Sequence, residues 1–242
     1  LAETYPIALE DNSSYNFFPG TSVSVEYRES VYVGYKYYDT AKKEVAFPFG
    51  HGLSYTTFEY SDVKVSSDKI KDTDTVTVSF KIKNTGAVDG AEVAQIYVND
   101  VESTIYRPVK ELRAFKKVFL KAGEETEVSV ELDKRAFAYY NVELGDWHVE
   151  SGDFKILVGA SSRDIRLETT VFVESTVEAR VPDYKETAPS YYGANIMNVS
   201  ADEFKAVYGK ELPPSVRDKN APFTLLNTIE DSKDGKWGGR IY

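Results

Sequence analysis

The feature that most constrains this chain is a series of short segments in which apolar and polar residues alternate. Residues 75–83 read Thr-Val-Thr-Val-Ser-Phe-Lys-Ile-Lys, which places four apolar side chains on one face, and the turn-forming Asn84-Thr85-Gly86 follows. Six other segments are also typical of strands: residues 58–65, 91–98, 112–120, 127–132, 154–159 and 166–173. About seven short strands separated by turns predict an antiparallel β-sandwich of the immunoglobulin or fibronectin type III architecture.

The absence of cysteine narrows that fold class. None of the 242 residues is Cys, so disulfides, thiolate nucleophiles and Cys-based metal sites are excluded. A fibronectin type III-like sandwich therefore fits better than an antibody-type domain. We expect an all-β chain in which this sandwich occupies residues 58–175, with irregular flanks over residues 1–57 and 176–242.

The two flanks differ from the centre of the chain. Both are rich in aromatic residues, glycine or proline, and neither shows a long helical period. One short helix is predicted from Ser200 to Tyr208, since Ser200 can cap it, Glu203 follows three residues later and Gly209 can end it. We expect the flanks to lack a core of their own and to pack on the sandwich or, for residues 1–57, on a domain outside this chain.

The charge balance bears on possible partners. The chain has 29 Lys and Arg against 39 Asp and Glu, a net charge of −10. Nucleic acids and anionic membranes attract basic surfaces, so neither is an expected partner. No apolar stretch approaches the ~20 residues that span a bilayer. The chain begins at Leu1 without a targeting signal, so we expect it to belong to a longer protein, cytoplasmic or secreted.

A specific resemblance begins at Phe-Pro-Phe-Gly-His-Gly-Leu-Ser-Tyr-Thr-Thr-Phe, residues 47–58. This resembles the segment of family 3 glycoside hydrolases, the β-glucosidase family, that leads from the α/β sandwich domain into the fibronectin type III-like domain. Other segments are similar in the same order: residues 18–20, 27–39, 83–86, 90–98, 107–112, 115–118, 152–163 and 199–214.

The resemblance implies the C-terminal portion of a retaining enzyme that removes terminal β-D-glucosyl residues. Its residues 1–57 would be the end of the α/β sandwich domain and the linker. The family's nucleophile, an Asp in a Ser-Asp-Trp context, belongs to a barrel domain that this sequence lacks, and its acid/base Glu belongs to an earlier loop. We therefore assign no catalytic, cofactor-binding or metal-binding residue and no cofactor. The expected partners are the missing barrel and α/β sandwich domains and, as an option, a second copy in a homodimer.

Several residues still invite a chemical interpretation. Asp100, Glu102 and Asp146 are candidate carboxylates, but solvated loop charge is the favoured interpretation. His51 lies between two glycines, where a turn is favoured over a base, and the lone His148 makes no metal site. The aromatic residues that could stack on sugars are Tyr37, Tyr38, Tyr139, Tyr140, Trp147, Tyr191, Tyr192 and Trp237. Packing within the sandwich is favoured for Trp147 and Tyr139, and contact with another domain for Tyr191, Tyr192 and Trp237.

Two other functions remain open. An independent carbohydrate-binding or adhesion module would need a row of exposed aromatic rings on one face, whereas the predicted strands present Lys, Glu and Thr. A self-contained hydrolase would need a pair of carboxylates about 5–5.5 Å apart, which the spacing does not indicate.

Overall fold

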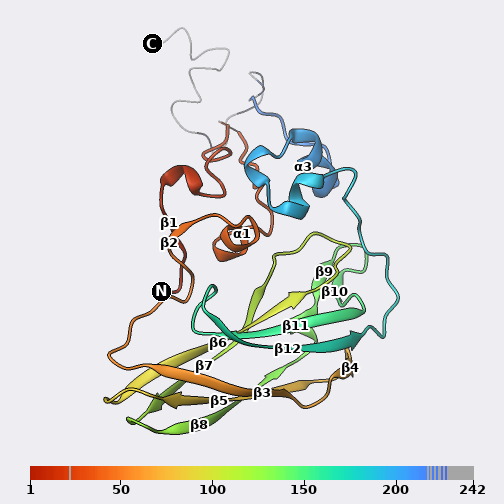
Figure 1. Ribbon diagram of the computed structural model, residues 1–242. Helices are drawn as coiled ribbons and strands as arrows, with labels where there is room; N and C mark the ends of the chain where they lie inside the picture. The colour runs from red at the N-terminus through yellow and green to blue at the C-terminus, as the bar shows by residue number, and fades with distance from the viewer. Residues whose placement is uncertain are drawn as a thin grey trace.

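Two β-sheets face each other across one hydrophobic core (Figure 1). The computed structural model describes residues 1–21 and 23–216, together with residues 218, 220, 222, 225 and 227. The larger sheet has the strand order β4-β12-β11-β6-β7 and the smaller β3-β5-β8. The strands of the larger sheet are β4 (Lys69–Lys71), β6 (Gly90–Asp100), β7 (Glu111–Leu120), β11 (Gly152–Gly159) and β12 (Ile165–Glu174). Those of the smaller sheet are β3 (Phe58–Val65), β5 (Val76–Asn84) and β8 (Glu125–Leu132).

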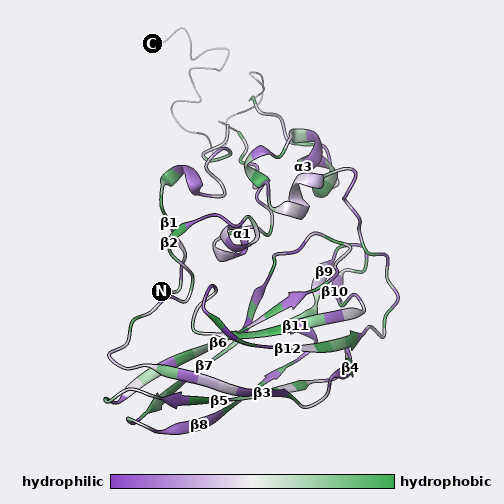
Figure 2. Cartoon of the chain, in the orientation of Figure 1, coloured by the Kyte–Doolittle hydropathy of each residue, from purple (hydrophilic) through white to green (hydrophobic). Residues whose placement is uncertain are grey.

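Alternation along the strands builds this core, which we call the sheet core. Strand β5 buries every second residue, including Val76, Phe80 and Ile82, and each of these is at most 1% exposed. In Figure 2 the strands alternate between hydrophobic and hydrophilic residues along their length. Burial of the apolar faces at about 25 cal/mol per Å² is the main force that holds the sheets together.

The seven predicted strands are all present, and a mostly β chain is confirmed. The expectation of purely antiparallel sheets needs correction, because β4 pairs with β12 in parallel through Phe172 and Lys69. Strand β4 is three residues long, too short to show an alternation. The structure also has α2 (Lys134–Phe137), followed by a two-stranded ladder of β9 (Tyr139–Asn141) and β10 (Asp146–His148). These elements were not predicted, because they too are short.

The flanks contain short elements. The N-terminal flank has β1 (Tyr5–Pro6), η1 (Leu9–Asp11), α1 (Tyr35–Thr40) and β2 (Val45–Phe47), and β1 pairs with β2. The C-terminal flank has η2 (Pro189–Gly193), η3 (Ile196–Asn198) and α3 (Ala201–Tyr208). The predicted helix is confirmed, with Ser200 and Glu203 in a reciprocal capping box and Gly209 left-handed at its end.

The two flanks, together with Tyr106 of the loop between β6 and β7, form a second hydrophobic core, which corrects the expectation that the flanks would bury their apolar residues only on the sandwich or on another domain. This flank cluster comprises Tyr32, Tyr37, Tyr38, Tyr106, Ala188, Tyr191, Ala194, Ile196 and Val199. The flanks lie side by side at one end of the sheets (Figure 1). The Tyr32 hydroxyl donates to the carbonyl of Tyr191 at 2.6 Å, and Arg28 donates to the carbonyl of Val199 at 3.0 Å. Neither flank could bury these rings alone.

Candidate functional site

A group of charged residues with largely buried side chains lies where the flank cluster meets the sheets, which we call the junction. Of the three candidate carboxylates, Asp100 lies in this junction, with a side chain only 3% exposed. Its Oδ2 is 2.9 Å from Nη1 of Arg107. Glu102 and Asp146 are exposed, as expected. The interpretation of Asp100 as solvated loop charge is wrong, because β6 continues to Asp100 and carries it under the loop that holds Arg107.

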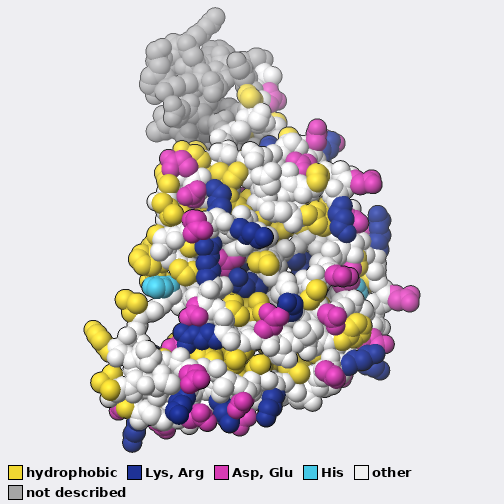
Figure 3. Space-filling model, viewed as in Figure 1, with side chains coloured by type: hydrophobic (Ala, Val, Ile, Leu, Met, Phe, Trp, Pro, Cys, Tyr) yellow, Lys and Arg dark blue, Asp and Glu magenta, His cyan; other side chains and the backbone are white. Residues whose placement is uncertain are grey.

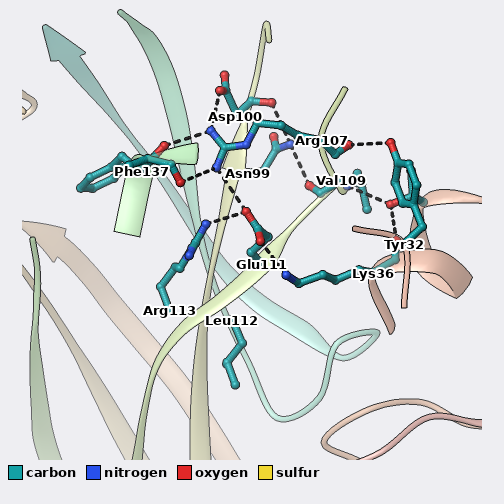
Figure 4. Close-up of polar contacts among 12 residues, drawn as sticks. Tyr32, Lys36, Asn99, Asp100, Arg107, Val109, Glu111, Leu112, Arg113 and Phe137 are labelled. Atoms are coloured by element: carbon teal, nitrogen blue, oxygen red, sulfur yellow. Dashed lines mark hydrogen bonds and ion pairs between the residues drawn. The ribbon is translucent and has the colours of Figure 1, made fainter. Parts of the chain in front are cut away.

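Glu111, at the start of β7, is the centre of the junction (Figure 4). Its Oε1 is 2.8 Å from Nζ of Lys36, and its Oε2 lies 3.2 Å from Arg107 and 2.5 Å from Arg113. Lys36 belongs to α1, whereas Arg113 belongs to β7. One carboxylate thus ties the N-terminal flank to the sheet. Arg107 also donates to the carbonyl of Phe137 at 2.9 Å.

The electrostatics of the junction hold Glu111 ionised. Burial favours its neutral form, but Arg113, Lys36 and Arg107 outweigh burial and lower the pKa of Glu111 below its ordinary value. Burial raises the pKa of Asp100, and Arg107 offsets this only in part. A carboxylate surrounded by three cations is suited to fixing a structure and is a poor proton donor near neutral pH.

Aromatic side chains of the β9–β10 ladder border the junction. Trp147 packs against the sheet core, with the guanidinium of Arg135 3.5 Å from its ring centre. Tyr140 meets Trp147 edge to face at 5.6 Å and is itself half exposed. Tyr139 is buried and lies beside His148. Packing accounts for Trp147 and Tyr139, while Tyr140 keeps a free face.

The tyrosine pairs of the flanks serve packing. Tyr37, Tyr38 and Tyr191 are buried in the flank cluster. The Tyr192 hydroxyl donates to the carbonyl of Thr104 at 2.8 Å, which attaches the C-terminal flank to the loop between β6 and β7. Trp237 lies outside the described residues.

His51 lies in a tight turn on the outer face of the larger sheet. Its amide donates to the carbonyl of Pro48, and Gly50 has a φ of +81°. A Cβ on Gly50 would lie 2.1 Å from the side chain of Gln95. The turn therefore needs glycine for its left-handed conformation, and a larger residue would also displace the Gln95 side chain, in agreement with the structural interpretation of this motif. The His51 ring itself lies 5.2 Å from the Phe47 ring.

His148 is buried at 3% exposure, and burial, with Lys134 nearby, lowers its pKa. No group of three potential metal ligands occurs in the part of the chain that the structure describes. Among these same residues, no helix is long and apolar enough to cross a membrane.

The importance of Lys36, Arg107, Glu111 and Arg113 was not recognised from the sequence. A signal was present, because Glu111 and Arg113 are two apart at the start of a strand and their opposite charges share a face. The contribution of Lys36, 75 residues earlier in the chain, could not have been read from spacing.

Comparison with known proteins connects this architecture to a family. The model of the fibronectin type III-like domain matches residues 92–162. Thermostable beta-glucosidase B of Acetivibrio thermocellus is 57% identical over 180 residues, which are 74% of this chain and 24% of that protein. The crystal structure of the Bifidobacterium adolescentis GH3 beta-glucosidase superposes with a TM-score of 0.71 at 42% identity, over 81% of this chain and 29% of that one.

The chain belongs to the family 3 glycoside hydrolases. It spans about a quarter of the length of the curated relatives it matches. Not all relatives of this family 3 chain are named beta-glucosidases. The exo-alpha-(1->6)-L-arabinopyranosidase of Bifidobacterium breve is 42% identical over 88% of this chain and 28% of that protein.

Proposed function

We propose that this chain is the C-terminal accessory portion of a retaining β-glucosidase and contains no catalytic carboxylate. The chain matches only 24% of the length of the A. thermocellus beta-glucosidase, so most of such an enzyme would lie outside it. The barrel and α/β sandwich domains of the same enzyme would be its partners. The substrate is assigned as a terminal β-D-glucosyl residue because most of the named relatives are β-glucosidases.

The observation that carries the proposal is the exposed apolar surface of residues 1–57, which we call the N-flank face. It contains Ile7, Leu9, Phe18, Tyr27, Leu53 and Tyr55, each at least 66% exposed. Hydrophobic side chains gather at the left edge of the molecule around β1 and β2 (Figure 3). A soluble protein seldom leaves so many large apolar groups uncovered unless another surface packs against them.

The chain would divide into three parts. Residues 1–57 would be the end of the α/β sandwich domain and its linker, residues 58–175 an immunoglobulin-like sandwich of the fibronectin type III-like kind, and residues 176–242 an extension. The turn at Gly50, held by Gln95, would fix the angle between the first two parts. The flank cluster would fasten the third part to the first.

The state of the junction carboxylates supports an accessory role. A retaining glycosidase needs two carboxyl groups about 5–5.5 Å apart that are free to attack the sugar and to transfer a proton. Asp100 and Glu111, the buried carboxylates of the junction, are both ion-paired with arginine. Their task would be to hold the loop after β6 in place.

The test is association with the remainder of the parent enzyme, produced as a separate chain. We expect a complex in analytical ultracentrifugation, weakened at least about tenfold by the double change Ile7→Ser and Leu9→Ser, since exposed apolar anchors dominate such contacts. Val142→Ser, an equally exposed valine in the turn of the β9–β10 ladder, is the matched control and should leave affinity unchanged. The absence of any complex would contradict the proposal.

An independent carbohydrate-binding module remains the second candidate function because two exposed aromatic rings lie on β7. Phe115 and Phe119 lie on the same face of β7 and are both 67% exposed. Sugar rings stack on exposed aromatic faces. Retention of the isolated chain on insoluble cellulose, abolished by Phe115→Ser with Phe119→Ser, would favour this function.

A further inference from the structure

A cavity of about 400 Å³ opens at the junction, between the flank cluster and the β9–β10 ladder. We call it the junction cavity. One wall comes from the flanks and includes Val31, Lys36 and Tyr184, and the other comes from the sheets and includes Arg113, Tyr140 and Trp147. Its volume lies within the ~300–1,000 Å³ of ordinary small-molecule sites.

The charge of the junction cavity is opposite to that of the chain. Among the residues that the structure describes, three cations line it, Lys36, Arg107 and Arg113, against one carboxylate, Glu111. Asp100 lies behind Arg107 with Glu150 near it, so the excess of positive charge belongs to the residues that line the cavity. The whole chain carries −10. A local positive excess in a partly enclosed site attracts anions more strongly than the same charge on an open surface.

Arg113 has hydrogen-bonding capacity to spare. Its Nη2 donates to Glu111, and 19% of the side chain remains exposed, so part of the guanidinium is open to a ligand. Its Nε has no partner among the described residues but is buried out of reach of the cavity. Burial lowers the pKa of the Arg113 guanidinium, Glu111 opposes this, and nearby Arg107 adds to it, so another negative group would be favourable here.

The remainder of the lining is apolar and largely aromatic. Tyr106 and Tyr184, with rings 6.0 Å apart, form part of the flank wall. Trp147 and the half-exposed Tyr140 form part of the wall opposite. Flat rings of this kind pack well on the face of another ring. Guanidinium groups match carboxylates in shape and charge.

We propose that the junction cavity binds a small carboxylate carried on a ring, with the carboxylate at Arg113 and the ring between the aromatic walls. The ring belongs either to a sugar acid or to an aromatic acid, since both present the same two features. Because such a ligand would contact α1 and β7 at once, its binding would strengthen the attachment of the N-terminal flank.

Tryptophan fluorescence of the full chain provides the test. The chain has two tryptophans, so Trp237→Phe leaves Trp147, which lines the cavity, as the sole reporter. Sodium D-glucuronate and sodium benzoate are titrated separately, which distinguishes the two sources of the carboxylate. D-Glucose and benzamide are the uncharged counterparts, and sodium phosphate tests for an anion without a ring.

We expect saturable binding of at least one of the two carboxylates, with a Kd at least about tenfold below that of its uncharged counterpart. Arg113→Gln should raise the Kd about tenfold, whereas Arg180→Gln, which removes the same charge from an exposed position, should leave it within about twofold. Should Arg113→Gln fail to fold, Tyr140→Ala removes a half-exposed ring of the wall and should also weaken binding. Equal binding of charged and uncharged probes, an effect of phosphate as strong as that of the carboxylates, or no saturation with either carboxylate would overturn the proposal.

Discussion

Glu111 is the residue on which the junction depends most. Its carboxylate balances Lys36, Arg107 and Arg113 in a site where its own side chain is 15% exposed. Paired charges in such a site gain little over apolar packing, but removal of one partner leaves the others uncompensated and is costly. The main effect of replacing Glu111 should therefore be the repulsion among the positive charges that it now balances.

Glu111→Gln should lower the free energy of unfolding by about 3 kcal/mol, because three cations would then face one another without a carboxylate. Chemical denaturation measures the change. Glu127→Gln, at an exposed position of β8, is the matched control and should alter stability by at most about 0.5 kcal/mol. Equal effects of the two substitutions would show that the junction does not depend on this ion network.

Glu29, buried near the flank cluster, predicts a pH dependence. Burial raises its pKa, and its Oε2 has no hydrogen-bond partner among the described residues. A carboxyl with a raised pKa in the folded state contributes stability that is complete below its unfolded pKa of about 4.3 and is lost as the pH rises through the folded value. Relative to wild type, Glu29→Gln should thus be more favourable at pH 7 than at pH 4. Chemical denaturation at pH 4 and at pH 7 measures the change in the free energy of unfolding that Glu29→Gln causes. The same change at both pH values would contradict the interpretation that burial raises the pKa of Glu29.

At the scale of elements, the strands were predictable and the way the flanks pack was not. Strands such as β5 and β8 alternate over eight or more residues, so a local pattern identifies them. The three-residue strands β4, β9 and β10 carry no such pattern. The flank cluster depends on contacts such as Tyr32 to Tyr191, 159 residues apart, which no local period reveals. For the same reason, the sequence shows the charged residues of the junction but does not show that they contact one another.

Tyr191→Ala tests whether the two flanks form one cooperative unit. The ring is fully buried, packs 4.8 Å from the Tyr106 ring and donates to the carbonyl of Arg28. Its removal should destabilise the flank cluster by about 3–5 kcal/mol. Hydrogen exchange should then show faster exchange in α1 and η2 together, while β5 and β6 keep their protection. Tyr208→Ala, at an exposed position in α3, is the control. Loss of protection in η2 alone would mean that the flanks are stable separately.

At the scale of the whole molecule, two hydrophobic cores are joined through a largely buried ionic junction, and the N-terminal flank leaves large apolar side chains exposed. The sheet core and the flank cluster account for most of the buried apolar side chains. The N-flank face exposes apolar groups on the flank that the junction fastens to the sheets. This arrangement suits the accessory role that we propose, in which the substrate chemistry would lie in parts of a family 3 glycoside hydrolase outside this chain.

The most direct test of this account is hydrolysis of p-nitrophenyl β-D-glucopyranoside by the purified chain, alone and mixed with the remainder of the parent enzyme. p-Nitrophenyl α-L-arabinopyranoside is assayed in parallel, because one relative bears the name of an arabinopyranosidase. We predict no hydrolysis of either substrate by the chain alone, and hydrolysis by the mixture above that of the remainder alone. Hydrolysis by the chain alone, lost on substitution of one of its own carboxylates, would contradict the account.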